Sequence, residues 1–482
     1  MNETYTRLLE QAAAWIEEHK AEYIAELQGI ARIPSVSRAD LAEPHAPFGP
    51  DCRKVLDYAL ERGRHYGFDV NDHDGCLGSI TMGDFDNAIG VIAHLDVVPV
   101  GDGWKYPQFG ATYIEEYDAM VGRGVSDNKG PWVATLFAMR MLRDLGWPLK
   151  HGIRLMCGMS EETGMQDVQL MLDRGEKFPK ITLVPDAAFP VNYAQKGSID
   201  AELTIPCGGN VLKFDAGSVR NIIPDLAVLE LAADHAAVEA AFAALDPEIT
   251  APIVIEPCEG GTRISAHGKS GHAASPASSI NAIMLLTRAL SAANVATDTG
   301  KTAIDEIYHL TQDGFGVSEG IAYQDEASGD TTLVYGVAHL KDGMLQLSVD
   351  SRYAISQDKA ALERDLRAHW AEHGWQVADY DMTTPFYIPK DDPRVTALQQ
   401  LYTEVTGRED EPYSMGGGTY SRVMPNAITF GPGVPGKKHE YPFLPEGHGG
   451  AHGRDEVVAM ESIYTCSRIY AAAIAALDEI EA

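Results

Sequence analysis

The segment Ile89-Gly90-Val91-Ile92-Ala93-His94-Leu95-Asp96 gives the clearest indication of the fold class. Its first five residues form an apolar run, which is typical of a strand buried on both faces in a parallel sheet. His94 and Asp96 follow, and their side chains leave an extended chain on the same face because they are two residues apart. The imidazole can then ligate a metal ion while the carboxylate orients it. His-x-Asp is also common by chance, so a surface turn remains an alternative at this point.

Predicted strands and helices alternate on both sides of this stretch. Apolar and amphipathic patterns predict strands over 78–82, 153–158 and 181–184, and helices over 51–66 and 131–145. Such alternation favours an α/β unit with a largely parallel sheet. Ligands of such sheets bind beyond the carboxyl ends of the strands. Polar residues that directly follow a predicted strand are therefore candidates for a ligand site.

From about residue 196 the pattern changes to α+β. The predicted strands there are 198–205, 227–231, 261–266 and 344–349, and the predicted helices are 238–245, 280–293 and 359–375. The α/β pattern resumes near residue 385 with a helix over 395–406, a strand over 427–430 and a last helix from about 456 to 480. Asp455 and Glu456 suit the first turn of that last helix, where negative charge is favourable. The α+β part therefore reads as an insertion into the α/β unit.

Composition excludes several kinds of partner. The chain has 38 Lys and Arg against 70 Asp and Glu, a formal net charge of −32, which argues against nucleic acid and anionic membranes. A solvated acidic surface and a preference for cationic substrates both fit this charge. The six cysteines are scattered and read as reduced and mostly buried. No apolar run is long enough to span a bilayer and the N-terminus lacks signal-peptide features, so a cytoplasmic location is expected.

Two acidic sites lie at the junctions of predicted elements. Asp127 stands in the glycine-rich segment Gly122-Arg123-Gly124-Val125-Ser126-Asp127-Asn128-Lys129-Gly130, just before the predicted helix 131–145. The glycines suit a tight loop that aims the carboxylate away from its own backbone, although a helix N-cap is the alternative. Glu161 and Glu162 follow the strand 153–158, and adjacent carboxylates repel unless a cation or proton lies beside them. One could be a metal ligand and the other a general base, or both could be solvated acids.

Asp186 and a histidine-rich segment complete the set. Asp186 directly follows the strand 181–184, and the later segment carries His448 and His452. His452 is favoured as a ligand because it stands at a loop-to-helix junction, and His448 is the alternative. These ligands are nitrogen and oxygen atoms without a thiolate, unlike those of a structural cysteine site. Such a set fits zinc, or else manganese or cobalt.

Three of these motifs, taken together, resemble the co-catalytic metallopeptidases that include carnosinases, aminoacylases and glutamate carboxypeptidases. They are His94-Leu95-Asp96-Val97-Val98-Pro99, the segment from Gly122 to Gly130, and Glu161-Glu162-Thr163-Gly164. The match runs in order over nearly the whole chain and is most similar to the PepV-type bacterial dipeptidases of that family. The resemblance implies an α/β catalytic domain, with a mixed, largely parallel sheet flanked by helices, over 1–195 and 385–482. It implies an inserted α+β lid domain over 196–384.

The resemblance also implies roles at the matching positions. The expected ligands of two divalent metal ions are His94, Asp127, Glu162, Asp186 and His452. Asp127 would bridge the two ions, and the peptide bond that follows it would be cis. Asp96 would support His94. Glu161 would be the general base that takes a proton from the bridging water and passes it to the leaving amine.

In the inserted domain, the motif Gly271-His272-Ala273-Ala274-Ser275-Pro276 matches one whose histidine stabilises the oxyanion. Asn221 and Arg352 match positions that bind the substrate carboxylate and backbone, a task that suits the planar fork of arginine. Without the resemblance, His272 and Arg352 read as an exposed loop histidine and a surface arginine. Gly417, Gly418 and Thr419 belong to a segment that matches a loop binding the C-terminal part of the substrate.

The function implied is hydrolysis of dipeptides with free N- and C-termini by a water that two metal ions activate. Alternatives within the family are an N-acyl amino acid amidase, a desuccinylase or a carboxypeptidase. A catalytically silent peptide-binding protein is the alternative of another class, and the presence of Glu161 with every ligand position speaks against it. The expected partner is a small peptide, with no nucleic acid and no membrane. A monomer is expected because the long lid resembles one that replaces a dimer partner.

Overall fold

The computed structural model describes residues 3–436 and 440–480, which fold into two compact units. The first unit comprises the chain up to Tyr193, Ile388–Tyr413 and the chain from Thr419 onward. The second comprises Ala194–Tyr387 and Ser414–Gly418. Ser414–Gly418 thus groups with the second unit, although the sequence pattern places it in the last α/β part. No helix among the described residues is both long and apolar enough to cross a membrane.

The first unit is built on a mixed sheet whose centre is parallel. Its strand order is β1-β2-β6-β3-β7-β24-β9, with β6, β3, β7 and β24 parallel and the flanking pairs antiparallel. The strands are β1 (Asp69–Asp72), β2 (Gly78–Met82), β3 (Ala88–His94), β6 (Gly152–Gly158), β7 (Thr182–Val184), β9 (Val191–Gln195) and β24 (Ala427–Phe430). Every residue of β3 and β6 is buried, as their apolar runs predict. The mixed α/β sheet is confirmed, with its parallel strands at the centre.

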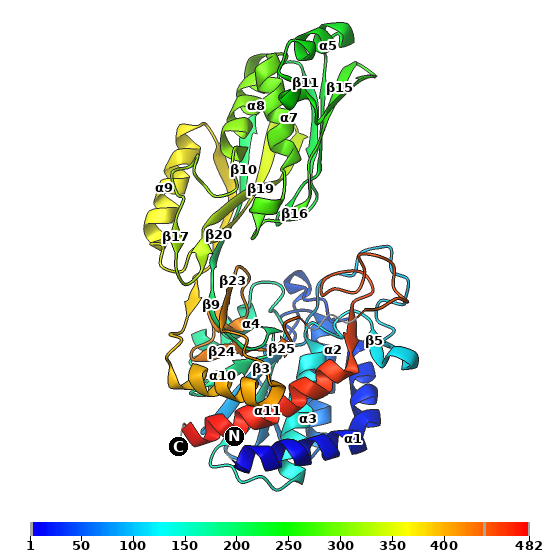
Figure 1. The fold of residues 1–482 in the computed structure, drawn as a ribbon, viewed down its shortest axis with the longest axis vertical. Coiled ribbons are helices and arrows are strands. Elements are labelled where there is room, and N and C mark those ends of the chain that lie inside the picture. The colour runs from blue at the N-terminus through cyan, green and yellow to red at the C-terminus, as the bar shows by residue number, and fades with distance from the viewer. Residues whose placement is uncertain (1–2, 437–439, 481–482) are drawn as a thin grey trace. The chain divides into compact units, whose positions relative to one another are not determined.

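Helices cover both faces of this sheet. They are α1 (Glu3–Ala31), α2 (Pro50–His65), α3 (Lys129–Asp144), α4 (Gln166–Asp173), α10 (Pro393–Thr406) and α11 (Met460–Ile480), with 3-10 turns at Ala39–Leu41, Glu115–Tyr117 and Tyr420–Arg422. α3 packs on β3 and β6, and α1 and α11, from the two ends of the chain, pack on α3 (Figure 1). On the other face, Val168 and Met171 of α4 pack with Ile92 and Met156. The central strands are therefore shielded on both sides.

Short strands outside the main sheet order the loops at its edge. β4 (Thr112–Ile114), β5 (Ala119–Val121) and β26 (Val457–Ala459) form one small sheet, and β8 (Ala187–Ala188) pairs with β25 (Pro432–Gly433). The prediction that the last helix begins near residue 456 is wrong by a few residues. Val457–Ala459 are extended because they pair with β5, and α11 begins only at Met460.

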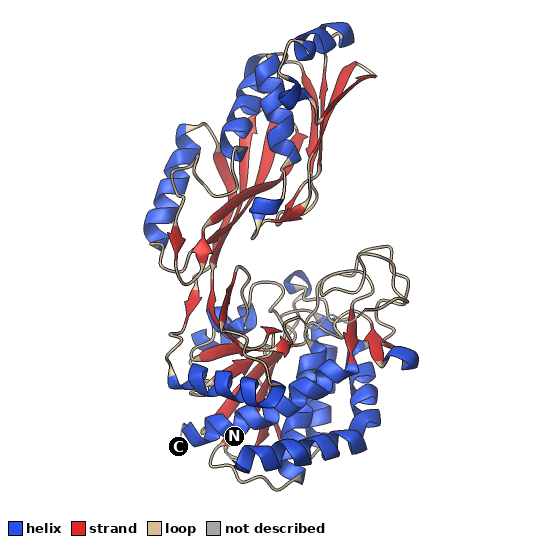
Figure 2. Cartoon of the chain, viewed as in Figure 1, coloured by secondary structure: helices blue, strands red, loops and turns tan. Residues whose placement is uncertain are grey.

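The second unit is an antiparallel sheet with helices packed on it (Figure 2). Its strand order is β14-β15-β13-β11-β19-β20-β10-β21. These strands are β10 (Gly197–Pro206), β11 (Val211–Ala216), β13 (Leu226–Leu231), β14 (Ile253–Cys258), β15 (Gly261–His267), β19 (Thr332–Lys341), β20 (Met344–Tyr353) and β21 (Gln376–Met382). The helices are α5 (His235–Ala243), α6 (Pro247–Thr250), α7 (Ala282–Ala293), α8 (Asp298–Thr311) and α9 (Lys359–Glu372), with a 3-10 turn at Pro276–Ser278. An α+β character for this part is confirmed.

The remaining strands of the second unit are short. β12 (Ile222–Ile223) pairs with β16 (Gly271–His272), and β17 (Gln324–Asp325) pairs with β18 (Gly329–Asp330). At the boundary between the units, Ala194 and Gln195 of β9 pair with β22 (Phe386–Tyr387), and β23 (Tyr413–Met415) also pairs with β9.

A buried polar chain ties three elements of the second unit together. The indole Nε1 of Trp370 donates to the Tyr335 hydroxyl at 3.3 Å, and that hydroxyl donates to Glu319 Oε1 at 2.8 Å. Ser318 Oγ donates to the other carboxylate oxygen at 3.2 Å. Burial raises the pKa of Glu319 to about 7. The folded unit therefore holds the Glu319 proton more tightly than the unfolded chain does.

The stability of the second unit should depend on pH through Glu319. Because the folded-state pKa is raised from 4.5 to about 7, its stabilising contribution is complete below the lower value and lost as pH rises through the upper one. The loss amounts to roughly 3 kcal/mol at full ionisation. Glu319→Gln keeps an acceptor for Tyr335 and cannot ionise. It should be more stable than wild type at about pH 8 and level with it at about pH 5 by scanning calorimetry.

Glu326→Gln serves as the control, because Glu326 is an exposed glutamate of the same unit. It should leave the pH dependence of the unfolding temperature as in wild type. An equal pH dependence in Glu319→Gln and wild type would contradict the assignment.

Candidate metal centre and active site

The predicted ligands lie at the carboxyl ends of neighbouring parallel strands. His94 is the last residue of β3, Glu161 and Glu162 follow β6, and Asp186 follows β7. β3 pairs in parallel with both β6 and β7, so these three strand ends reach the same edge of the sheet. This edge is where ligands of open α/β sheets bind.

Asp127 lies between two groups of side chains. Its Oδ1 is 3.0 Å from His94 Nε2, and its Oδ2 is 3.1 Å from His452 Nε2. His94 Nε2 is also 3.6 Å from Asp186 Oδ1, and His452 Nε2 is 3.0 Å from Glu162 Oε1. One carboxylate oxygen therefore faces the pair His94 and Asp186, and the other faces the pair His452 and Glu162.

The loop that carries Asp127 has the tight geometry its glycines predict. Gly124 has a φ of +84°, and a Cβ on Gly130 would lie 2.2 Å from the Val125 carbonyl oxygen. The N-cap of α3 is Asn128, without a side-chain cap bond, so the N-cap alternative for Asp127 is wrong. The Asp127–Asn128 peptide bond is cis, as the resemblance implies.

The structure brings His452 rather than His448 to the cluster. His448 Nδ1 lies 2.6 Å from Asp455 Oδ2, and the Asp455 carboxylate also accepts the backbone N–H groups of Lys105 and Tyr106. His448 is thus engaged in holding its own loop. His452 Nε2 faces Asp127 and Glu162 as described above.

Asp96 links His94 to the paired glutamates. His94 Nδ1 is 3.0 Å from the Asp96 carbonyl oxygen and 3.5 Å from its carboxylate. Donation from Nδ1 to that carbonyl leaves the lone pair of a neutral ring on Nε2, which faces Asp127. The Asp96 carboxylate accepts the backbone N–H groups of Glu161 at 3.1 Å and Glu162 at 3.0 Å. Asp96 therefore acts through its backbone on the histidine and through its side chain on the glutamates.

Arg123 and Glu456 form a buried ion pair that the sequence reading did not single out. Arg123 donates to Glu456 Oε2 at 2.8 Å, and both side chains are at most 1% exposed. The Glu456 carboxylate also accepts the backbone N–H groups of Gly124, Ser126 and Asp127 at 2.8 to 3.0 Å. Arg123 donates to the carbonyl oxygens of His452 and Gly453, both at 3.1 Å. This pair joins the Asp127 loop to the His452 loop.

Asp167 was also missed, since a lone aspartate in a helix carries no signal of its own. It is fully buried and accepts the backbone N–H of Met159 at 2.7 Å and of Ser160 at 3.2 Å. The Tyr420 hydroxyl donates to the same carboxylate oxygen at 2.5 Å. Burial raises the pKa of Asp167 to about 6. Asp167 fixes the turn between β6 and Glu161.

The electrostatics of the cluster favour a bound cation. Burial raises the pKa of Glu161 above its usual value, and the carboxylate of Asp186 raises it further. Burial likewise raises the pKa of Asp186 to about 6, against the lowering effect of His94. Divalent cations keep such carboxylates ionised by neutralising their charge. The ligand atoms of His94, Asp127 and Glu162 lie within 4.8 Å of one another, and so do those of His94, Glu161 and Asp186. Either of these groups, which share His94, could hold an ion.

A cavity of about 360 Å³ adjoins these carboxylates within the first unit. Asp127 and Asp186 line it together with apolar side chains such as Val457 and Ile463. A cavity with a few polar groups on an apolar wall is the usual form of a small-ligand site.

The other predicted site residues lie mostly in the second unit. His272 and Asn221 are brought together, because Ile222 pairs with His272 and the Ala273 N–H donates to the Asn221 carbonyl oxygen at 2.9 Å. Asn221 and Arg352 line one hollow of about 540 Å³. The Arg352 guanidinium donates to both carboxylate oxygens of Asp350, at 2.9 and 2.6 Å.

The glycine loop is divided between the units. Gly417 and Gly418 belong to the second unit and Thr419 to the first. The Thr419 side chain is buried, with its Oγ1 2.7 Å from Thr429 Oγ1, so it does not present a hydroxyl at the surface.

Comparison with known proteins assigns the chain to a class. The sequence model of peptidase family M20/M25/M40 matches residues 90–476. A Bacillus subtilis (strain 168) protein named "Putative dipeptidase YtjP" is 31% identical, covering 94% of this chain and 97% of its own. A Staphylococcus haemolyticus protein named "Putative dipeptidase SH1171" is 26% identical, covering 96% of this chain and 98% of its own.

Solved structures share the fold. Human carnosine dipeptidase 1 has a TM-score of 0.58 at 16% identity, with 98% of this chain and 100% of that chain covered. The di-peptidase Dug1p from Saccharomyces cerevisiae has a TM-score of 0.58 at 14% identity, with 99% of both chains covered. The chain belongs to peptidase family M20/M25/M40. It is an enzyme, a metallopeptidase, and the family implies divalent metal ions.

Removing the charge of Glu456 should loosen the Asp127 loop. Glu456→Gln leaves Arg123 buried without a counter-charge and removes an acceptor of backbone N–H groups. Metal affinity and peptidase activity should each fall roughly 10- to 100-fold, as for other residues that orient metal ligands. Isothermal titration with Zn²⁺ or Mn²⁺ and peptide hydrolysis measure these effects.

Glu461→Gln is the matched control, since Glu461 is exposed in the first turn of α11. It should keep the metal affinity and the peptidase activity of wild type. Wild-type metal affinity in a folded Glu456→Gln protein would show that the pair does not support the centre.

Proposed function

We propose that this chain is a dipeptidase that hydrolyses short peptides with free N- and C-termini. The observation that carries the proposal is the position of Asp127, with one carboxylate oxygen toward His94 and the other toward His452. Relatives that match over nearly their whole length and bear the name dipeptidase support the same substrate class. The first unit would be the catalytic domain and the second a lid that binds substrate.

The side chains fit two divalent ions. His94 and Asp186 would hold one ion and His452 and Glu162 the other, with Asp127 shared between them. This donor set of imidazoles and carboxylates suits zinc first, and manganese or cobalt as alternatives. When bound, such ions lower the pKa of a water molecule and polarise the substrate carbonyl.

Glu161 is proposed as the general base. It would take the proton of the attacking water and deliver it to the amine that leaves when the peptide bond breaks. Its backbone N–H is held by the Asp96 carboxylate, and Asp167 holds the turn before it. Both contacts limit how far the Glu161 carboxylate can drift from the cluster.

The second unit is proposed to bind the peptide. The backbone N–H of Ala274 donates to His272 Nδ1 at 3.1 Å, so a neutral ring carries its proton on Nε2. An exposed Nε2–H is the donor that an oxyanion needs. Asn221 and Arg352 would bind the substrate carboxylate, with Asp350 fixing the plane of the guanidinium. Backbone groups of Gly417, Gly418 and Thr419 would bind the C-terminal part.

The proposal is tested by a substrate panel. Metal-loaded enzyme should hydrolyse free dipeptides, and a chelator should abolish the activity until Zn²⁺, Mn²⁺ or Co²⁺ is restored. Matched N-acetylated dipeptides and N-succinyl amino acids lack the charged free amine. They should react at least tenfold more slowly by kcat/KM, roughly the cost of one lost contact to a charged group. Faster hydrolysis of the acylated compounds would indicate an amidase or desuccinylase. Binding of dipeptides without hydrolysis would indicate a silent member.

Replacing Glu161 by glutamine should remove the base and keep the shape. Glu161→Gln is expected to lower kcat by about 10²- to 10⁴-fold, the usual contribution of general acid–base catalysis, with KM and metal content little changed. Glu176→Gln, at an exposed glutamate after α4, should behave as wild type. A kcat near the wild-type value in Glu161→Gln would assign the base elsewhere.

The cytoplasmic location and the monomeric state of this chain remain predictions.

A further inference from the structure

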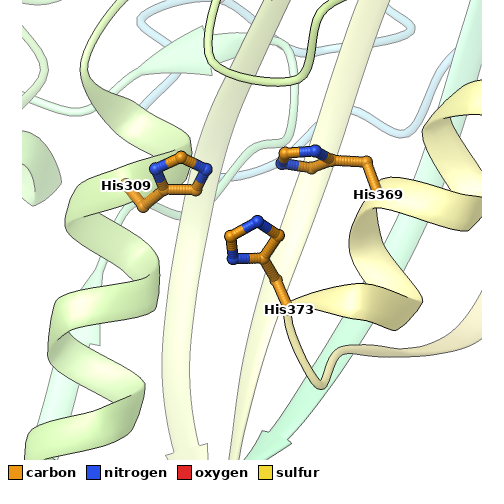
Figure 3. A group of neighbouring side chains, drawn as sticks. All are labelled: His309, His369 and His373. Carbon is orange, nitrogen blue, oxygen red and sulfur yellow. The ribbon is translucent and has the colours of Figure 1, made fainter.

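Three histidines of the second unit face one another at the ends of two helices. His309 lies in the last turn of α8, His369 lies in the last turn of α9, and His373 caps the end of α9. Their ligand nitrogens lie within 4.8 Å of one another (Figure 3). His369 and His373 are four residues apart, so one helical turn places them on the same side of α9.

Two of the ring nitrogens are buried without a partner. Among the residues that the structure describes, neither His309 Nε2 nor His369 Nε2 has a hydrogen-bond partner. A shielded polar atom of this kind is uncommon in a folded protein and costs stability unless something binds it. Two such atoms beside a third imidazole are the arrangement that a cation would satisfy.

The third histidine is oriented by a carboxylate. His373 Nδ1 lies 2.8 Å from Glu306 Oε2, one turn before His309 on α8. A proton on Nδ1 leaves the Nε2 lone pair as the ligand, and a ring nitrogen of His373 points toward the other two rings (Figure 3). Carboxylate support of this kind is usual behind metal-bound histidines and raises their basicity.

The helix ends beside the three histidines also favour a bound cation. The carboxyl ends of α8 and α9 both meet here, and helix carboxyl ends attract cations.

We propose that His309, His369 and His373 form a metal site in the second unit that binds one divalent transition-metal ion of the zinc class. Imidazole ligands suit Zn²⁺, Co²⁺, Ni²⁺ and Cu²⁺, whereas Mg²⁺ and Ca²⁺ prefer oxygen. Three protein ligands leave a fourth position of a tetrahedral ion for water. The site lies outside the Asp127 cluster and does not depend on the proposed peptidase function.

Binding requires the rings to turn. The His309 and His373 rings are now stacked, with centroids 4.5 Å apart and planes at 16°. Zinc–nitrogen bonds of about 2.0–2.1 Å need the three lone pairs to converge in the ring planes. All three side chains are partly exposed, so small rotations about their side-chain bonds are open to them. The ion would then cross-link α8 to α9, which are far apart in the sequence.

The test counts zinc ions in the full chain. After chelator treatment and dialysis against micromolar free Zn²⁺, mass spectrometry should find one more ion per chain in wild type than in His309→Phe or His369→Phe. Phenylalanine keeps a stacked ring and removes the nitrogen, so a purely structural stack would survive the change. His267→Asn, at an exposed histidine of β15, should bind as many ions as wild type.

Crystals of the wild-type chain grown with Zn²⁺ give an independent measure. Anomalous diffraction at the zinc edge should show a peak about 2.0–2.1 Å from a nitrogen of each of the three rings. Equal zinc content in wild type and the phenylalanine variants, or no peak at the cluster, would overturn the proposal. Dipeptide hydrolysis is not a readout here, so this outcome is separate from that of the proposed function.

Discussion

Repulsion among the carboxylates of Asp127, Glu161, Glu162 and Asp186 is the constraint around which the first unit is arranged. The topology of a parallel sheet gathers Glu161, Glu162 and Asp186, because the ends of β3, β6 and β7 reach one edge. The loop before α3 adds Asp127. Like charges this close are unstable unless positive charge lies among them. His94 lies beside Asp127 and Asp186, and His452 lies beside Asp127 and Glu162. Divalent ions would supply the rest of the positive charge.

Three further carboxylates hold that arrangement in place without joining it. Asp96 accepts the backbone N–H groups of Glu161 and Glu162, Asp167 accepts those of Met159 and Ser160, and Glu456 accepts those of the Asp127 loop. A buried carboxylate that accepts two or three backbone N–H groups is satisfied without a metal ion. The first unit therefore uses acidic residues in two ways, one set facing the cluster and the other fixing its loops.

The second unit has a different polar interior. Glu319, Tyr335 and Trp370 form a hydrogen-bonded chain between a loop, β19 and α9, and the three histidines stand where α8 and α9 end. α9 takes part in both features. Polar groups that link distant elements in this way favour one packing over its alternatives, because each element must be in place for the groups to be satisfied.

The elements of the first unit could be predicted because their signals are local. The apolar run before His94 becomes β3, the predicted strand 78–82 is β2, and the strand over 427–430 is β24. The error at the last helix has a physical cause. Val457–Ala459 are extended because β5 lies beside them, and no helix-start signal records a partner more than 300 residues earlier in the chain.

Local sequence patterns were enough to predict the α/β character, the inserted α+β part and the candidate residues of the cluster. Periodicity and motif order are properties of neighbouring residues. Tertiary packing places His452 rather than His448 beside the cluster, pairs Arg123 with Glu456 across 333 positions, and brings His309 to His369 and His373. Those contacts depend on how loops and helices pack after the sheet has formed. Residues distant in the sequence leave no periodic pattern by which their contacts could be read.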